Sequence, residues 1–323
     1  MKSVLSAVVV VSAAGTLSAC VVVDSQGHIT REEKRFTVSG VPDLKLTTFD
    51  GAIEVHSGDA KMVLVEIEKR GPTQEGVDQL RVEAKQDGDK IEIEVKRPAR
   101  EIVTFGIGAS PTAKLIVTMP REGNVTAKSG DGSINVEEVH GRLELRTGDG
   151  SIRGRDIGGQ MTLYTGDGSV TLESASGDLD VDTGDGSVSV SGKLGAVKLH
   201  TGDGTITFRA DAGTTMTGDW SMTTGDGSIS LYLPSDFSAE LDAHTGDGSI
   251  RNELRLAAEA EAGGDRESSR RTLRAKLMTS CRVRRGAEPV TSMLIRSVCD
   301  PSPHGRRQPR SSARADAARR PCR

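Results

Sequence analysis

Residues 147–152 read Thr147-Gly148-Asp149-Gly150-Ser151-Ile152, and this hexapeptide recurs along the middle of the chain with almost no variation. Seven copies follow the pattern S/T-G-D-G-S/T-I/V, and they begin at Ser129, Thr147, Thr165, Thr183, Thr201, Thr224 and Thr245. The first five copies are equally spaced, and the last two intervals are longer. A short fixed period of this kind predicts a solenoid, in which each repeat is one turn of the chain.

Apolar residues recur at fixed distances from the aspartate of each copy. Two apolar positions precede it by six and four residues, as Leu143 and Leu145 precede Asp149. A third apolar column follows it by three residues: Ile134, Ile152, Val170, Val188, Ile206, Ile229 and Ile250. Both stretches alternate with period two, which is typical of short strands with one buried face. The predicted fold class is all-β, a single-stranded parallel β-solenoid (β-helix) with about 18 residues per rung.

Asp and Gly predict the corners between these strands. An Asp side chain accepts the backbone N–H two residues onward, and Gly tolerates positive φ at low steric cost. We therefore expect a structural turn ladder formed by Asp131, Asp149, Asp167, Asp185, Asp203, Asp226 and Asp247. Each carboxylate is expected to accept N–H groups of its own turn, and the neighbouring Thr hydroxyl is a further donor.

A row of Ca²⁺ ions is the alternative account of the aspartates. Neighbouring carboxylates would lie ~4.8 Å apart and repel one another. Ca²⁺ needs six to eight oxygen ligands, however, and one Asp-Gly pair per repeat supplies few. The sequence therefore predicts no cofactor and no metal.

The chain begins with features of a secreted protein. Lys2 precedes an apolar run that ends in Leu17-Ser18-Ala19-Cys20, too short for a membrane-spanning helix and typical of a signal peptide over residues 1–19. Leu-Ser-Ala-Cys resembles the lipobox of bacterial lipoproteins, which implies lipidation of Cys20 and a cell-envelope location. Val21, rather than Asp, after the Cys would favour the outer membrane in a Gram-negative source. The alternative is ordinary cleavage beside an incidental Cys.

Four further segments follow the signal peptide. We expect a polar, lipid-anchored tether over residues 20–35 and an N-terminal β-rich section with the first rungs over 36–128. Within that section Thr48–Ile53 reads as a degenerate first rung, and Asp87-Gly88 as the turn of a hairpin. The regular solenoid is expected over 129–262, and residues 21–262 carry 41 acidic and 25 basic side chains, which argues against nucleic acid as a partner.

Residues 263–323 differ from the rest in composition. They carry 15 Arg and one Lys against five acidic residues, hold three of the four Cys, and lose the repeat period from about Met278. We expect a last strand at Leu273–Leu277, followed by an irregular basic tail. One interpretation is a disordered basic segment that contacts anionic polymers. The other is a shifted reading frame, which would make the tail non-native.

The hexapeptide repeats, the lipobox and the strand Leu231-Tyr232-Leu233-Pro234 together resemble the bacterial envelope family called putative adhesins. The resemblance covers roughly Phe36 to Leu277. It implies a β-solenoid at the cell surface or in the periplasm, with an adhesive or scaffold role. The family offers no catalytic residue to carry over.

The search for chemistry in the sequence favours a non-catalytic protein. His200 and His244 each precede a T-G-D-G, but the rung at Thr223 separates them by roughly 9 to 10 Å, too far for one metal. The repeated Ser residues lack a positioned base, and every repeated Asp has a structural explanation. We therefore predict a lipid-anchored binding, adhesion or scaffold module whose partners are the membrane, through its lipid, and envelope proteins or polysaccharide. The alternatives are a polysaccharide-active β-helix enzyme and a sensory partner of an envelope-stress system.

Overall fold

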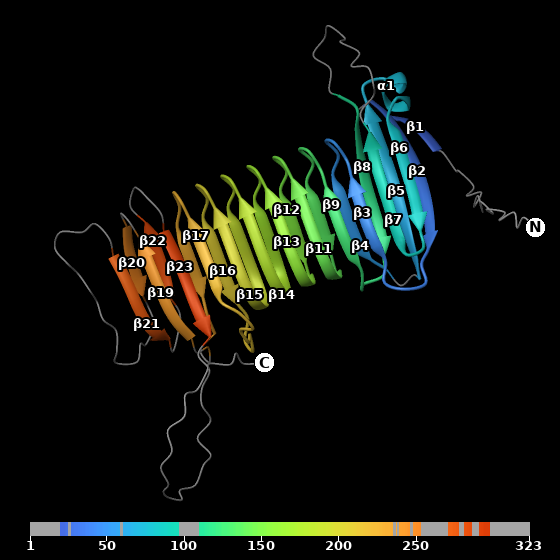
Figure 1. Cartoon of the computed structure of the whole chain (residues 1–323). Coiled ribbons are helices and arrows are strands. Elements are labelled where there is room, and N and C mark those ends of the chain that lie inside the picture. The colour runs from blue at the N-terminus through green and yellow to red at the C-terminus, as the bar shows by residue number, and fades with distance from the viewer. Residues whose placement is uncertain are drawn as a thin grey trace, which may run out of the picture.

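The computed structural model describes residues 20–24, 27–58, 61–96, 110–234, 237, 239–245, 248–252, 271–277, 281–285 and 291–297. Strands dominate these residues, and the helix among them, α1 (Gln74–Asp78), has five residues. The predicted all-β class is confirmed. All the strands belong to one hydrogen-bonded sheet, which forms an elongated stack (Figure 1).

Two series of neighbouring strands run along the stack. Series A consists of β6 (Arg81–Asp87), β7 (Lys90–Lys96), β3 (Asp43–Thr47), β9 (Asn124–Lys128), β11 (His140–Thr147), β13 (Gly158–Thr165), the second halves of β14 (Val170–Thr183) and β15 (Val188–Thr201), and β17 (Trp220–Thr224). Series B consists of β1 (Cys20–Asp24), β2 (Gly27–Thr37), β5 (Met62–Gly71), β8 (Thr112–Met119), β4 (Ile53–Ser57), β10 (Ile134–Glu137), β12 (Ile152–Arg155), the first halves of β14 and β15, β16 (Ile206–Ala210) and β18 (Ile229–Tyr232). From β3 and β4 onward to β17 and β18, neighbours in both series pair in parallel.

The register of the parallel strands follows the hexapeptide. Ile134 pairs with Ile152, and the same offset leads on to Val170, Val188 and Ile206. Ile206 then pairs with Ile229, so the extra residues of that longer interval lie outside the pairing. Inward-facing residues of both series are buried and form one hydrophobic cluster. We call one turn of chain, with its strand in each series, a rung.

The hexapeptide corner brings the backbones of neighbouring rungs unusually close. A Cβ atom placed on Gly150, Gly168, Gly186 or Gly204 would lie 2.3, 2.0, 1.9 or 2.1 Å from the carbonyl oxygen of the equivalent glycine in the preceding rung. The described hexapeptide glycines are not among the residues with positive φ. The prediction that they serve a positive φ is therefore wrong, because close approach between rungs is what requires Gly here.

The Thr of each hexapeptide points inward and bonds the preceding rung. Thr183 is 1% exposed, and its hydroxyl oxygen lies 3.1 Å from the carbonyl oxygen of Gly168 and 3.3 Å from that of Gly166. Within the same corner, the N–H of Gly168 donates to the Thr165 hydroxyl at 3.2 Å. The Thr ladder therefore satisfies backbone groups that face the interior, and not the Asp carboxylates as the sequence suggested.

A second corner follows the series B strands. Glu138, Asp156 and Ser174 have φ angles of 57°, 50° and 55°, and they occupy equivalent positions in three successive rungs. Gly141, Gly159 and Gly177, which recur in the sequence at the interval of the repeat, also have positive φ. Gly195 does not continue this column, because β14 and β15 shift register and pair Ala175 with Gly192.

The N-terminal section closes one end of the stack. β3 and β4 form the degenerate first rung and pair directly with β9 and β10, so the intervening strands β5 to β8 extend the two series outward. The predicted hairpin is confirmed as β6–β7, with Gly88 at φ 60°.

The segment predicted as a tether is part of this cap. β1 pairs with β2, and β2 pairs along its length with β5. The charges that read as a solvated tether form ion pairs across these strands, Lys69 Nζ to Glu32 Oε1 at 2.5 Å and Arg31 Nη2 to Glu68 Oε2 at 2.9 Å.

The C-terminal end departs from the sequence prediction. β21 (Arg271–Leu277) covers the predicted last strand, but β22 (Cys281–Arg285) and β23 (Thr291–Ser297) follow where an irregular tail was expected. β23 lies between β17 and β19 (Ala239–Thr245), and β22 between β18 and β20 (Gly248–Asn252), all in antiparallel pairing. Direct stacking of the Thr245 rung on the Thr224 rung is therefore not observed. An open strand edge can pair with any segment that supplies backbone hydrogen bonds. The repeat pattern therefore does not predict which segment pairs there.

Candidate functional site

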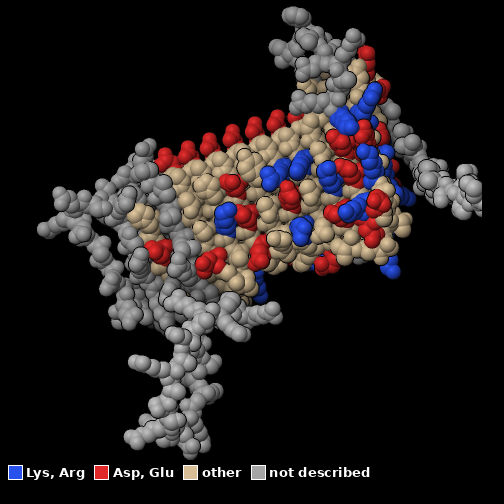
Figure 2. Space-filling model, viewed as in Figure 1, with Lys and Arg blue, Asp and Glu red and all other residues tan. Residues whose placement is uncertain are grey.

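The aspartates of the hexapeptide form an exposed row along one edge of the stack (Figure 2). Asp131, Asp149, Asp167, Asp185 and Asp203 are all exposed, and their carboxylates have no hydrogen-bond or ion-pair partner among the described residues. Instead, the turn N–H groups bond the preceding rung, as Asp185 N–H does to the Gly166 carbonyl at 3.3 Å. Asp226 continues the column after the longer interval, and Asp247 lies outside the described residues. The expected bonds from each turn to its own carboxylate are therefore not observed.

The aspartates of the hexapeptide and the two histidines are the side chains that the sequence offered as possible metal ligands. Within the described part of the chain, no three His, Cys, Asp or Glu side chains gather as metal ligands. His200 pairs with Thr223, Thr223 with Ser292, and Ser292 with His244, so two strands separate the histidines where the sequence predicted one. At ~4.8 Å per strand they are about 14 Å apart, well beyond reach of a shared ion.

Cys20, the predicted lipidation site, opens β1. Its backbone pairs with Arg31 of β2, while its side chain and residues 1–19 lie outside the described residues. Among the described residues, no helix is long and apolar enough to span a bilayer.

The outward faces of the stack vary from rung to rung, in contrast to the inward columns. One row of series A, linked strand by strand through the register, changes in charge and size along the stack: Thr126, Glu144, Thr162, Asp180, Lys198 and Ser221. The Thr ladder beneath it is uniform from Thr147 to Thr224. The stack therefore displays non-repeated chemistry on a repeated frame.

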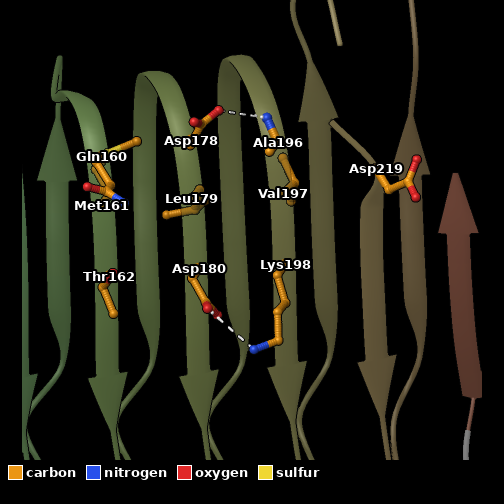
Figure 3. Close-up of a pocket in the computed structure, with 10 residues that line it drawn as sticks. All are labelled: Gln160, Met161, Thr162, Asp178, Leu179, Asp180, Ala196, Val197, Lys198 and Asp219. Atoms are coloured by element: carbon orange, nitrogen blue, oxygen red, sulfur yellow. Dashed lines mark hydrogen bonds and ion pairs between the residues drawn. The ribbon is translucent and has the colours of Figure 1, made fainter. Parts of the chain in front are cut away.

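A shallow groove of about 280 Å³ lies on the series A face, across β13, β14 and β15 (Figure 3). We call it the series A groove. It is lined by Gln160, Met161, Thr162, Asp178, Leu179, Asp180, Ala196, Val197, Lys198 and Asp219. Met161, Leu179 and Val197 are buried inward residues, so the outward polar side chains decide its chemistry. None of its three carboxylates belongs to the hexapeptide.

Two of these carboxylates are held in place by short contacts. Asp178 Oδ1 accepts the Ala196 N–H at 3.0 Å and the Thr217 hydroxyl at 3.3 Å. Asn124 accepts the Arg142 N–H in the same way at 3.0 Å, so this bond is a recurring device that joins two rungs. Lys198 Nζ lies 3.3 Å from Asp180 Oδ2, with both side chains largely exposed.

The groove forms where the repeat is interrupted. The register between β14 and β15 shifts near Gly177 and Leu179. The residues inserted between β16 and β17 then return along the face, where Thr217 N–H donates to the Gly195 carbonyl at 3.1 Å and Asp219 reaches the groove. The small side chain of Ala196 stands in a row that otherwise carries Arg142, Gln160 and Asp178, and this leaves the face hollow.

Tyr164 lies on the same strand face as the groove residue Thr162. Its side chain is 42% exposed, and the Arg146 guanidinium lies 5.8 Å from the ring centroid. Aromatic side chains are scarce in this chain, at 2% of residues, and Trp220 and Phe208 are buried. An exposed Tyr beside a polar groove is therefore a distinctive surface feature.

A second polar cluster occupies the corner between β8 and β12. Arg121 Nη2 donates to Asp156 Oδ2 at 2.6 Å, and His140 Nε2 lies 3.6 Å from Asp156 Oδ1. The hydrogen bond and charge of Arg121 hold the pKa of Asp156 below its usual value. On the neighbouring face, Arg155 likewise lowers the pKa of Glu137, which also lies 3.4 Å from His56 Nδ1.

Sequence reasoning did not find the groove. Its signal is the run Asp178-Leu179-Asp180-Val181-Asp182, where outward positions turn acidic although the inward apolar columns continue. The groove residues were missed because they are outward positions that do not repeat, whereas the repeated residues are structural.

The chain belongs to the Toastrack DUF4097 family, whose model matches residues 41–277. A comparison with curated proteins found no match.

Three solved bacterial structures match part of this chain. A putative cell adhesion protein from Clostridium sporogenes is 11% identical, with 56% of this chain and 99% of that chain covered and a TM-score of 0.36. A putative adhesin from Bacteroides fragilis is 12% identical, with 62% and 95% covered and a TM-score of 0.37. A putative lipid binding protein from Parabacteroides distasonis is 11% identical, with 62% and 94% covered and a TM-score of 0.25. Likeness at this level carries no argument about function.

Proposed function

We propose that the chain is a lipid-anchored β-solenoid of the cell envelope, with about 18 residues per rung, that acts without catalysis as a binding or scaffold module. The observation that carries the proposal is the contrast between uniform inward columns and varied outward rows. The inward columns and the corner bonds recur in each rung and hold neighbouring rungs together. Outward variation on a rigid sheet is the arrangement that binding surfaces use.

The binding proposal is tested with isolated envelope material. The purified full chain is mixed with outer membranes or sacculi, which are then sedimented, and the bound fraction is measured. We expect binding to fall when the outward series A residues Thr162 and Asp180 are changed together to Ala. The equivalent outward pair of earlier rungs, Thr126 and Glu144, serves as the matched control. Equal binding by both double variants, or none by the wild type, would contradict the proposal.

The anchor rests on Cys20 and the preceding Leu17-Ser18-Ala19. Lipid on the first mature residue would tie β1, and through β2 the cap of the stack, to the membrane surface. Metabolic labelling with a palmitate analogue is expected to mark the wild type and to leave Cys20→Ser unmarked. Unlabelled wild-type protein would remove the anchor from the proposal.

One observation favours a polysaccharide-active enzyme as the second candidate. The series A groove contains three carboxylates that are not part of the repeat, and a glycosidase uses a pair of carboxylates. Two of them are occupied in local contacts, Asp178 with the Ala196 N–H and Asp180 with Lys198. Release of reducing ends from an oligosaccharide by the wild type, abolished by Asp180→Asn, would establish this candidate in place of the first.

A further inference from the structure

We propose that the series A groove is a saccharide subsite, in which neutral sugar hydroxyls bond to Gln160, Thr162, Asp180 and Lys198 while a sugar ring packs against Tyr164. This inference rests on the proposed binding function and names the ligand class for one of its surfaces. Its starting point is the place of the groove: it is a hollow on an otherwise repetitive face, at the point where the repeat is broken.

The lining offers donors and acceptors side by side. Thr162, Asp180 and Lys198 occupy one row on three adjacent strands, about 4.8 Å apart. Lys198 donates, Asp180 accepts, and the Thr162 hydroxyl does both. Two neighbouring hydroxyls of a sugar ring can each donate to a carboxylate and accept from an ammonium group, so the Asp180–Lys198 pair matches a diol. Gln160 adds an amide that also has both functions.

The polar groups are held by a rigid frame. Each belongs to a strand paired on both sides, and the inward neighbours Met161, Leu179 and Val197 are at most 3% exposed. Asp178 is fixed by its bonds to the Ala196 N–H and the Thr217 hydroxyl, which leaves its second oxygen for a ligand. Preorganised partners reduce the ordering cost of binding.

Tyr164 supplies the apolar component. It stands two residues after Thr162, so both side chains leave the same face of β13 about 6.7 Å apart. A pyranose ring has one face made of C–H groups and an edge of hydroxyls. The exposed Tyr164 ring and the neighbouring polar row match these two surfaces.

The lining carries three carboxylates and one ammonium group, so its charge disfavours an anionic ligand. Lys198 balances Asp180 within the groove at 3.3 Å, and its ammonium would repel a cationic group. One oxygen of Asp178 is already bonded. The volume of about 280 Å³ lies at the lower end of ligand sites, which suits one or two sugar units at the surface of a longer chain.

The test measures binding of two neutral oligosaccharides, cellotetraose and chitotetraose, to the full chain by saturation-transfer NMR and calorimetry. Asp180→Asn and Tyr164→Ala are compared with Thr126→Ala, which changes an outward residue of the same row two rungs away. We expect millimolar binding of at least one oligosaccharide by the wild type. Each groove variant should weaken it about tenfold, the size expected for loss of one charge-assisted bond or one aromatic contact, while the control leaves it unchanged.

Four outcomes would overturn the inference. The first is that neither oligosaccharide binds the wild type at ~10 mM, the upper end of the weak affinities that a shallow site supports. The second is that Thr126→Ala weakens binding as much as the groove variants do, and the third is that both groove variants bind as well as the wild type. The fourth is that tetralysine binds and the sugars do not. Melting curves confirm that each variant is folded, since all three substitutions are on the surface. If the sugars do not bind but the chain still sediments with envelope material, the saccharide inference fails and the binding function stands.

Discussion

Individual glycines at the hexapeptide corner are constrained by the next rung, not by their own conformation. A Cβ atom added to Gly186 would lie 1.9 Å from the carbonyl oxygen of Gly168, far inside van der Waals contact. Backbone atoms on both sides belong to paired rungs, so neither can move without breaking corner hydrogen bonds. The uniformity of the motif therefore has a packing cause.

Gly186→Ala tests this cause. We expect the free energy of unfolding to fall by about 3 kcal/mol, since the added methyl forces two rungs apart. The measurement is urea denaturation, with Ser169→Ala as the control because Ser169 is the exposed residue that follows Gly168 in the preceding copy of the motif. Stability equal to that of the wild type would mean that the corner is free to open.

Substitution of an exposed aspartate of the hexapeptide, unlike that of a corner glycine, is not expected to destabilise the fold. Asp185 has carboxylate neighbours one rung away on both sides, in Asp167 and Asp203, and repulsion at ~4.8 Å amounts to about 0.9 kcal/mol per pair in water. We expect Asp185→Asn to be neutral or to stabilise by at most about 1 kcal/mol, because salt screens exposed charges. The melting temperature of the wild type should not rise in millimolar Ca²⁺. A clear calcium-dependent rise, lost in Asp185→Asn, would instead make the row a metal site.

For individual residues, the sequence predicts which side chains face inward better than it predicts what each side chain contacts. The period places the three apolar columns correctly in the described rungs, because period-two alternation of apolar residues is visible in the sequence. The role of Gly and Thr depends on the distance to another rung, which no local pattern contains. The same limit explains why Asp178 and Asp180 were not recognised as lining a groove: the register shift that hollows the face is a property of two strands together.

Among the elements, β2 and β5 show how charge can conceal a strand. Gly27–Thr37 contains an unbroken run of charged residues from Arg31 to Arg35, and as a single segment it reads as a tether. Beside β5 its charges find partners across the pair, such as Lys69 for Glu32. The strand is therefore defined by its neighbour, and sequence alone could not assign it.

The corner between β8 and β12 predicts a pH dependence. Arg121 depresses the pKa of Asp156, so this contact stabilises the fold above the unfolded-state pKa of about 3.9 and is lost as pH falls through the lower folded-state pKa. We therefore expect wild type and Asp156→Asn to differ in melting temperature at pH 5 and to converge toward pH 2. Asn tolerates the left-handed backbone of this position, so the substitution tests charge and not strain.

Asp149→Asn is the control for this pH experiment, because its carboxylate is exposed and has no partner among the described residues. Its melting temperature at pH 5 should equal or slightly exceed that of the wild type, because the neighbouring carboxylates of the row only repel it. A difference between wild type and Asp156→Asn that persists at pH 2 would show that Arg121 does not act through the Asp156 charge.

The stack is closed at one end by β1, β2 and β5 to β8, and its outermost described strands at the other end are β21 and β20, of which β21 lies outside the repeat. Stacked repeats need caps, because the last rung otherwise exposes strand edges and apolar residues. β21 covers the outer edge of β19, whereas β22 and β23 lie inside the stack, paired antiparallel with β17 and β18 on one side and with β19 and β20 on the other. They also separate two rungs that carry the same motif, so the order of strands at this end is not the one that the period encodes.

The rungs at Thr224 and Thr245 remain compatible with direct stacking. Leu241 and Ala243 alternate inward as Trp220 and Met222 do, and all four are buried. If β22 and β23 are removed by ending the chain after Leu277, we expect β19 to pair in parallel with β17 at the register of the preceding rungs. The shortened chain should then fold, because two parallel pairings, β17–β19 and β18–β20, form in place of the four antiparallel pairings of β22 and β23.

A disulfide measures which of the two arrangements is present. Direct stacking would place residues 223 and 244 opposite each other at about 4.8 Å, within the Cα separation that a disulfide spans, whereas an intervening β23 holds them at about 9.6 Å, beyond it. With the native cysteines replaced by Ser, we expect Thr223→Cys/His244→Cys to cross-link under mild oxidation in the shortened chain and not in the full chain. Unfolding of the shortened chain, or the absence of a cross-link in it, would show that β22 and β23 are indispensable to this end of the stack, because the repeat alone would then be unable to complete its own last rung.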